Sequence, residues 1–434
     1  MDAEQKLALL SDNATLEASE EVSSIPLTPR LIEGATASPF DLPSCHTSNP
    51  YPTAPIAFGD PRNAEFKGRA DAVARPHSQP TGHNPKDISN SIHHAIMPGG
   101  KRIALLKTML TSACERDCYY CPFRAGRDFR RATFKPDEMA SVFDQIARKG
   151  IAEGLFLSSG IAAGGPRTQD RLIAAIEILR QKYGFTGYVH LKLMPGAEED
   201  QIRRAMQIAD RVSINLEAPN SARLARIAPH KVLIDELVRP LRVVEKIRRE
   251  NGGRGPSQTT QFVVGGAGEP DTEILKTVAY LHREVRLARA YFSAFRPLRD
   301  TPLENQPPAH PLREHRLYQA DFLFRQYGFA FDDFVFDATG HLPLEVDPKI
   351  AWARIHLAHQ PIELNRAARD ELLRVPGIGP KSVNVILAAR RKGRLRDLAH
   401  LRQLGILADR AAPFILLDGH RPAYQLTLPT LNNE

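Results

Sequence analysis

Three cysteines lie close together in the chain and give its clearest chemical signal. Cys114, Cys118 and Cys121 form a C-x3-C-x2-C motif. Three thiolates on one short loop can bind three irons of a 4Fe–4S cluster and leave the fourth iron open to another ligand. Structural zinc is the alternative, but zinc usually takes paired knuckles, and the sequence has no second one. The motif therefore predicts an iron–sulfur centre.

The cysteine usage also bears on the cell compartment. A fourth cysteine, Cys45, lies far upstream in a Pro-rich stretch, and we expect it to be a bystander. Four cysteines in 434 residues are too few for a disulfide framework, and clustered thiols favour a reducing, cytoplasmic environment. No apolar run approaches 18 residues, and the acidic N-terminus lacks the features of a signal peptide. We therefore expect no membrane association.

Strands alternating with helices must position the cysteine loop, which directly follows the first strand. Apolar runs and three- and four-residue periodicities predict these elements. The expected strands are 103–111, 154–158, 188–193, 212–216, 259–264 and 290–295. The expected helices are 136–149, 170–182, 198–209, 231–249, 272–285 and 311–327. This order predicts an α/β fold, a partial (β/α)6 barrel in which ligands gather at the carboxyl ends of the strands.

Composition divides the chain into four parts. Residues 1–97 form a Pro-rich, partly disordered extension that begins with one amphipathic helix. Residues 98–340 form the barrel, and 341–360 form a linker rich in loops. Residues 361–425 form a small all-α domain at the C-terminus.

The C-terminal domain contains a glycine-rich turn between two helices. The first helix ends near Arg374, the turn is Val375-Pro-Gly-Ile-Gly, and Pro380 occupies the favoured first position of the second helix. Gly377 and Gly379 permit close backbone approach, and Lys381 lies beside the free N–H groups of the helix start. This arrangement suits a phosphate. A weaker copy over 395–417 lacks the Gly-x-Gly turn, and we expect it to be the structural half of a pair.

Positive charge is concentrated in the same region. The chain has 58 Lys and Arg against 50 Asp and Glu, a net charge of +8. From residue 361 onward there are 12 Lys and Arg against 7 Asp and Glu, a net of +5. Arg390 and Arg391 belong to this excess, which is the electrostatic signature of a nucleic-acid interface. A protein-docking or packing role is the alternative.

The cysteine motif, with Tyr120 directly before the last cysteine, resembles the signature of the radical S-adenosylmethionine (SAM) enzymes. The likeness extends over about residues 98–300. It implies that SAM binds the open iron through its amino and carboxylate groups. It further implies that the reduced cluster cleaves SAM to methionine and a 5′-deoxyadenosyl radical, which abstracts a substrate hydrogen.

The resemblance implies further cofactor-binding residues. Where the family has a Gly-Gly-Glu-like stretch that meets the SAM amino group, this chain instead has Ser158, Ser159 and Gly160. Polar side chains at the end of the fourth strand, Asn215 and Glu217, are implied to reach the ribose or the methionyl part of SAM. A G-x-x-E stretch after the fifth strand, which contains Gly266 and Glu269, is implied to support the adenine site.

Two cations complete the expected site. Lys192 lies on the third strand and Arg296 ends the sixth. A cation in a barrel mouth needs an anionic partner, which the SAM carboxylate, a substrate phosphate or Glu217 could each supply. A structural ion pair within the barrel is the alternative for each. The sequence assigns no catalytic residue.

The C-terminal turn resembles the helix-hairpin-helix motif of DNA repair and recombination proteins, which grips backbone phosphates. Together with the barrel it resembles the bacterial radical SAM proteins assigned to DNA modification or repair. The resemblance implies an enzyme that abstracts hydrogen from a nucleic acid, preferentially DNA. It also implies an external electron donor such as flavodoxin or ferredoxin. An RNA-modifying radical enzyme and a non-catalytic iron–sulfur nucleic-acid-binding protein remain as alternatives.

Overall fold

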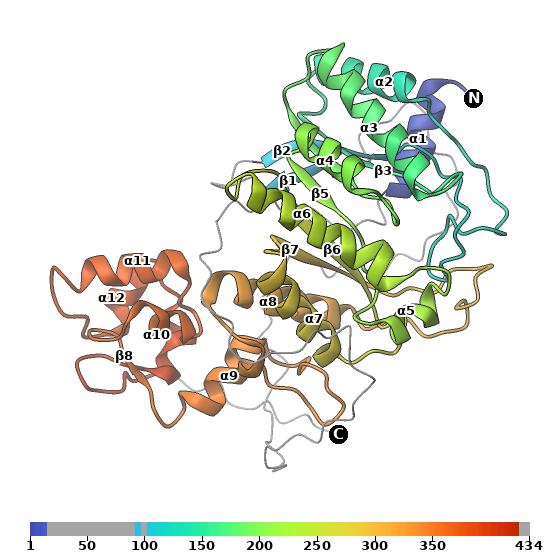
Figure 1. The fold of residues 1–434 in the computed structure, drawn as a ribbon. Coiled ribbons are helices and arrows are strands. Elements are labelled where there is room, and N and C mark those ends of the chain that lie inside the picture. Colours follow the sequence, from blue (N-terminus) through green and yellow to red (C-terminus); the bar gives the residue numbers. More distant parts are fainter. Residues whose placement is uncertain (15–91, 97–101, 425–434) are drawn as a thin grey trace. The chain divides into compact units, whose positions relative to one another are not determined.

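The computed structural model describes residues 1–14, 92–96 and 102–424 (Figure 1). The Pro-rich stretch of the N-terminal extension and Cys45 lie outside the described residues. The chain divides into two compact units, and among the described residues the boundary falls between Glu314 and His315.

The first unit contains a curled, half-barrel sheet of seven strands in the order β1 to β7. The first strand pairs antiparallel with the second, and the remaining neighbours are parallel. The strands are β1 Ile92–Ile96, β2 Arg102–Met109, β3 Gly154–Ser158, β4 Tyr188–Lys192, β5 Arg211–Ser213, β6 Ser257–Val264 and β7 Arg289–Ala294. The six parallel strands are those that the sequence predicts, so the expected partial (β/α)6 barrel is confirmed.

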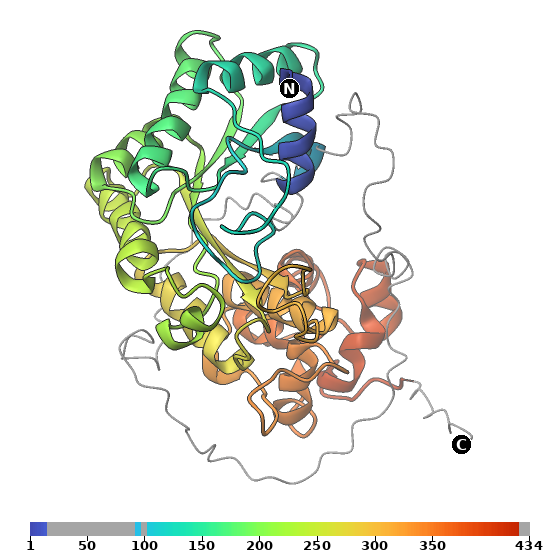
Figure 2. The ribbon, with the colours of Figure 1, turned by 90° about the vertical axis from the view of Figure 1, so that its right-hand side faces the viewer.

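Helices connect the parallel strands and lie along one face of the sheet (Figure 2). They are α2 Pro136–Arg148, α3 Gly165–Gln181, α4 Glu199–Ile208, α5 Ser221–Ile227, α6 Arg239–Glu250 and α7 Asp271–Glu284. A π-helical turn, Leu233–Val238, leads directly into α6. Each longer helix buries an apolar stripe; in α2 this stripe includes Met139, Phe143 and Ile146.

The two faces of the sheet differ in chemistry. Side chains alternate along each strand, so one face carries the apolar residues that pack under the helices. The other carries polar side chains, such as His190, whose Nε2 lies 2.7 Å from Ser213 Oγ on the next strand. Lys107 and Lys192 lie over the ring of Phe156 on this face, at 5.3 and 5.7 Å. This polar face opens at the carboxyl ends of the strands, where the cysteine loop begins.

Part of the expected extension is folded onto this unit. The predicted helix is present as α1, Ala3–Ala14, and it packs against β2. It buries Leu7 and Leu10, and Lys6 pairs with Glu138 at 2.7 Å. The sequence predicts the helix but neither its docking nor β1, because an amphipathic pattern identifies an apolar face without identifying its partner.

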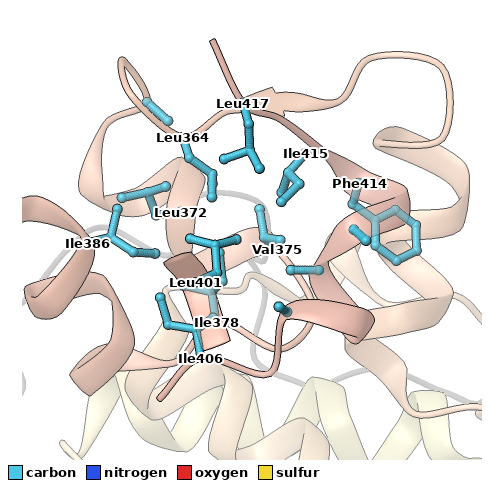
Figure 3. Close-up of a cluster of buried hydrophobic side chains, with 14 of the residues drawn as sticks. Leu364, Leu372, Val375, Ile378, Ile386, Leu401, Ile406, Phe414, Ile415 and Leu417 are labelled. Atoms are coloured by element: carbon cyan, nitrogen blue, oxygen red, sulfur yellow. The ribbon is translucent and has the colours of Figure 1, made fainter. Parts of the chain in front are cut away.

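Among the described residues, the second unit runs from His315 to Tyr424 and has its own apolar core (Figure 3). It includes the end of α8 Pro311–Tyr327, the short 3-10 turn Phe331–Asp333 and α9 Pro348–His356. Its C-terminal elements are β8 Ile362–Glu363, α10 Arg369–Arg374, α11 Pro380–Ala389, α12 Leu398–Gln403, α13 Ala408–Ala411 and β9 Ile415–Leu416. Strands β8 and β9 pair in parallel and bring the two ends of this region together.

The structure differs from the expected linker over 341–360. Helix α9 lies in this stretch, and Ala353 and Leu357 are buried in the same core as the hairpin helices. Trp352 packs against that core. The sequence predicted a connection here because loops surround α9, but two apolar residues of this helix and the leucine after it are enough to join it to the core.

The weaker second hairpin is also present. Helices α12 and α13 contact one another across a turn in which Gly405 has φ +72°. Leu401 and Ile406 fill the core beside Ile378 of the first hairpin (Figure 3). Within the described residues, no helix is long and apolar enough to cross a membrane.

Candidate functional site

The loop after β3 runs beside the cysteine loop and positions its first half. Leu110 N–H donates to Ser158 O at 2.8 Å, and Gly160 N–H donates to Thr111 O at 2.7 Å. A Cβ on Gly160 would lie 2.4 Å from the Ala113 carbonyl oxygen. Only glycine permits this close approach, so the predicted Ser158-Ser159-Gly160 stretch does meet the cysteine loop.

A second set of contacts fixes the cysteine loop from the other side. Tyr119 N–H donates to Ile227 O at 2.7 Å, at the end of α5. Arg116 pairs with Glu236 at 2.6 Å and also donates to the His230 carbonyl. The cysteine loop is therefore held between the β3 loop and the segment that follows β5.

The three thiols are free, and backbone donors approach two of them. Ile161 N–H lies 3.4 Å from Cys114 Sγ, and Phe123 N–H lies 3.4 Å from Cys121 Sγ. Such N–H···S contacts stabilise cluster thiolates and tune their redox potential. Burial raises the pKa of Cys118 and Cys121, and the charge of Lys231 only partly offsets it. Metal binding is what ionises such thiols.

Tyr120 and Glu217, both predicted as site residues, meet beside the cysteines through a third residue. Lys231 Nζ lies 2.9 Å from Glu217 Oε1 and 3.2 Å from the Tyr120 hydroxyl oxygen. Burial opposes the charged form of Lys231, but the negative charges of Cys118 and Glu217 outweigh it and raise the pKa of this lysine. Sequence analysis missed Lys231, because it precedes a helix 110 residues after Cys121 and has no motif of its own.

Glu217 is held in a backbone conformation that L-residues rarely adopt. Its φ is +65°, and its side chain is 5% exposed. Its N–H donates to Gln261 O at 2.9 Å and its carbonyl accepts from Val263 N–H at 2.8 Å, so β6 fixes the backbone on both sides. Strain of this kind persists where surrounding contacts impose it, commonly at functional sites. Here it accompanies a carboxylate paired beside the cysteine loop.

Lys192 and Asn215 also come together, since Lys192 Nζ donates to Asn215 Oδ1 from the neighbouring strand. Lys192 is buried against Phe156. These two side chains lie on the polar face of the sheet, at the carboxyl ends of β4 and β5. Their position agrees with the expectation that they line the mouth of the barrel.

The G-x-x-E stretch forms a loop that its own glutamate organises. Glu269 is buried, and its carboxylate accepts from Gly265 N–H at 2.5 Å and Ala267 N–H at 3.1 Å. Burial raises the pKa of Glu269, and the hydrogen bonds from these N–H groups and the charge of Arg313 partly offset this increase. Gly266 lies within this loop; a Cβ there would meet the Phe295 side chain at 3.2 Å. The structure thus gives Glu269 a role in shaping the loop.

Arg296 differs from the expectation of a cation inside the barrel mouth. It follows β7 in sequence, but its side chain is exposed. The sequence places it at a strand end, yet the direction of the chain beyond β7 decides where the side chain lies. Only the tertiary structure contains that information.

The first hairpin has the geometry expected of its glycines. Gly377 has φ +81°, and a Cβ there would lie 2.6 Å from Leu407 O in the second hairpin. Gly379 is the N-cap of α11, and Lys381 is exposed in the first turn of that helix. The free N–H groups of this helix start form an anion-binding position.

The two arginines predicted beside the hairpin have different surroundings. Arg390 Nη1 donates to the carbonyls of Leu364 and Ala367, at 3.2 and 2.7 Å. It therefore holds the segment before α10 in place. Arg391 is exposed, as are Lys392, Arg394 and Arg396. The exposed members of this set provide the positive surface of the unit.

The fold is a half-barrel with a three-cysteine loop at the carboxyl ends of its strands, an arrangement suited to an iron–sulfur cluster, and a hairpin module follows it in the chain. Comparison with known families agrees: residues 108–281 match the radical SAM superfamily, and residues 362–389 match the helix-hairpin-helix motif. The chain therefore contains a radical SAM domain, followed by a helix-hairpin-helix motif towards the C-terminus.

Individual relatives are distant. An uncharacterized protein of Methanocaldococcus jannaschii, MJ0785, is 24% identical over 225 residues, which are 49% of this chain and 55% of that protein. The hydrogenase maturase HydG is 13% identical with a TM-score of 0.41, over 51% of this chain and 49% of that one. Methylornithine synthase (PylB) is 13% identical with a TM-score of 0.43, over 52% and 63%. At such scores these likenesses add nothing to the assignment, and the chain spans about half to two thirds of the relatives it matches.

Members of the superfamily bind a 4Fe–4S cluster and SAM, and the described residues fit the cluster. No three His, Cys, Asp or Glu side chains among them converge as ligands of a single ion. A 4Fe–4S cluster instead takes each thiolate on a different iron. Three free cysteines on one loop, with N–H donors on two sulfurs and a buried lysine beside them, supply that donor set.

Proposed function

We propose that this protein is a radical SAM enzyme that abstracts hydrogen from a nucleic acid, preferentially DNA, in modification or repair. One observation carries the proposal: the radical SAM domain and a helix-hairpin-helix motif occur in one chain, and the hairpin has an exposed lysine at the start of α11. Hairpins of this kind bind backbone phosphates without reading the bases. The proposal includes a cytoplasmic location and an external donor such as flavodoxin or ferredoxin.

Three sets of residues have separate roles in binding the cofactors. Cys114, Cys118 and Cys121 would hold the cluster, which supplies one-electron cleavage of SAM and hydrogen abstraction when both cofactors are bound. The Lys231–Glu217 pair fixes the cysteine loop and places a buried positive charge beside it. The other predicted cofactor residues, Tyr120, Ser158, Ser159, Gly160, Lys192 and Asn215, border the same end of the sheet and would contact SAM.

The enzymatic part is tested by anaerobic reconstitution with iron and sulfide, followed by SAM and a strong reductant. We expect 5′-deoxyadenosine to form, and to form faster when the substrate nucleic acid is present. The control is a variant with serine at all three cysteines, which should bind no iron. If the wild type loads iron but never cleaves SAM, the proposed reaction is wrong.

The nucleic-acid part is tested by binding of labelled duplex DNA, single-stranded DNA and RNA of one sequence at several salt concentrations. Neutralised phosphates release counterions, so affinity should fall steeply with salt. Lys381→Glu should weaken binding about tenfold, because it replaces an attraction to phosphate by a repulsion. Tighter binding to RNA than to DNA would favour an RNA-modifying enzyme, and binding unaffected by Lys381→Glu would argue against the hairpin as the interface.

A further inference from the structure

A partly buried lysine lies directly behind the hairpin turn. Lys349, in the first turn of α9, donates from Nζ to the carbonyl oxygen of Ile378 at 2.7 Å. Its Nζ also lies 4.4 Å from the ring centre of Tyr327, at the end of α8. A Cβ on Gly379 would lie 3.1 Å from the Tyr327 hydroxyl, so the turn packs closely on this side. Lys349 therefore supports the turn from the side of α8 and α9.

The contact with Ile378 O fixes the direction of one peptide group. The Ile378–Gly379 peptide is trans, as are all the described ones, so its N–H points opposite to its C=O. Because the C=O faces Lys349, the Gly379 N–H faces away from it. Gly379 is the N-cap of α11, where the N–H groups of the helix start are free to bind an anion.

We propose that Lys349 is a positioning residue that orients and polarises the Ile378–Gly379 peptide, so that the hairpin presents the Gly379 N–H to a nucleic-acid phosphate. The proposal rests on the nucleic-acid function proposed above. A cation at the carbonyl oxygen strengthens the peptide dipole and makes its N–H a better donor. From behind the turn it also adds a positive charge to that of the exposed Lys381.

The charged neighbours of Lys349 leave its own charge sensitive to pH. At the N-cap of α9, Asp347 pairs with Arg410 of α13, and on α10, Arg374 pairs with Asp333 at 2.8 Å. Each neighbouring carboxylate thus has an arginine of its own. Burial is the main reason that the pKa of Lys349 is lowered to about 7; Asp347 opposes this shift, and the charges of Arg410 and Arg374 contribute to it.

The sign of the pH dependence follows from this position. A phosphate bound at the turn favours the charged form of Lys349, so binding raises the pKa of this lysine and takes up a proton. Below pH 7 the lysine is charged in both states and affinity is highest. As the pH rises above 7, the free protein loses the charge and affinity falls. Between pH 6 and pH 8.5 the loss should be about tenfold.

The experiment measures binding of the full chain to a fluorescein-labelled 20-base-pair DNA duplex at fixed salt, from pH 6 to pH 8.5. Wild type should show the fall. Lys349→Met should bind about tenfold more weakly at pH 6 and lose the pH-dependent part. Lys349→Arg keeps its charge throughout and should show no fall. Lys381→Met, which removes an exposed cation, should weaken binding equally at every pH and keep the wild-type slope.

Comparing the variants isolates the contribution of Lys349 to the pH dependence, because histidines of this unit, such as His356, are present in every variant. Equal pH slopes in wild type, Lys349→Met and Lys349→Arg would overturn the inference. If Lys349→Met unfolds, as circular dichroism would show, the slope of Lys349→Arg decides. If wild type binds neither duplex nor single strand at low salt, the proposed function itself fails. If wild type binds DNA with an affinity that does not change with pH, only the proposed role of Lys349 is wrong.

Discussion

The Lys231–Glu217 pair illustrates how single residues set the chemistry beside the cysteines. Both side chains are almost fully buried, at 10% and 5% exposure. Two charges taken out of water are costly to keep unless each has a partner, so each stabilises the other. The strained backbone of Glu217 and the Tyr120 hydroxyl belong to the same arrangement. Removing one charge should therefore cost more than removing both.

Lys231→Met is expected to lower the free energy of unfolding by about 3–5 kcal/mol, since it leaves Glu217 buried without its partner. Denaturant unfolding of the iron-free protein, followed by circular dichroism, measures this loss. The double variant Lys231→Met/Glu217→Gln should recover part of the stability. Additive losses in the double variant would mean that the pair does not couple.

Residues linked by local spacing were predictable, and residues linked only in space were not. The three cysteines and the hairpin glycines lie within a few positions of each other, so their chemistry is visible in the sequence. Lys231 and Lys349 act on groups far along the chain, and a lone lysine carries no spacing signal. For Arg296 and Arg390, the position in the sequence predicted contact with a ligand. In the structure Arg296 is exposed, and Arg390 donates hydrogen bonds to backbone carbonyl oxygens.

At the scale of elements, the paired loops after β2 and β3 decide where the thiols lie. Glycine at position 160 lets the two backbones approach, and the N–H of the following residue reaches Cys114 Sγ. The second loop is thus part of the cluster site although it contains no predicted metal ligand. A side chain at position 160 should push the cysteine loop away.

Gly160→Ala should lower the free energy of unfolding by about 1–3 kcal/mol, because its Cβ overlaps the Ala113 carbonyl. It should also reduce the iron bound per chain after reconstitution. Gly393→Ala is the matched control, since no atom lies within 4 Å of the added Cβ. A Gly160→Ala protein with the full iron content and wild-type stability would show that the loops can separate without loss.

The parallel strands and most helices could be predicted because their hydrophobic periodicity is strong. Two elements of the first unit were not predicted, the antiparallel strand β1 and the seven-residue helix α5. An edge strand such as β1 forms because β2 offers unpaired backbone groups, which is a property of the sheet. The π-helical turn Leu233–Val238 lies within the predicted helix 231–249, but its π geometry has no sequence signal of its own.

For the whole molecule, the structure changes the position of the domain boundary. The expected C-terminal domain begins at residue 361, but the second compact unit begins at His315. Ala353 of α9 and Leu357, which directly follows the helix, belong to the hairpin core, and Trp352 packs on it. The smaller fragment would therefore expose part of its core.

A fragment of residues 315–424 should fold cooperatively, whereas residues 361–424 alone should melt at a lower temperature or without cooperativity. Each buried leucine that the shorter fragment leaves without packing costs about 1.5–3 kcal/mol. Thermal unfolding followed by circular dichroism compares the two. Equal melting temperatures would place the boundary at 361 after all.

The sequence by itself determined the alternation of strands and helices, the cysteine motif, the hairpin turn and the concentration of positive charge near the C-terminus. Each of these depends on residues close in the chain, where spacing and periodicity follow directly from backbone geometry. Only the tertiary structure decided which lysine lies beside the cysteines, which lies behind the hairpin, and that α1 and α9 belong to packed cores. Those outcomes depend on pairing and burial between distant segments, which the order of residues does not display.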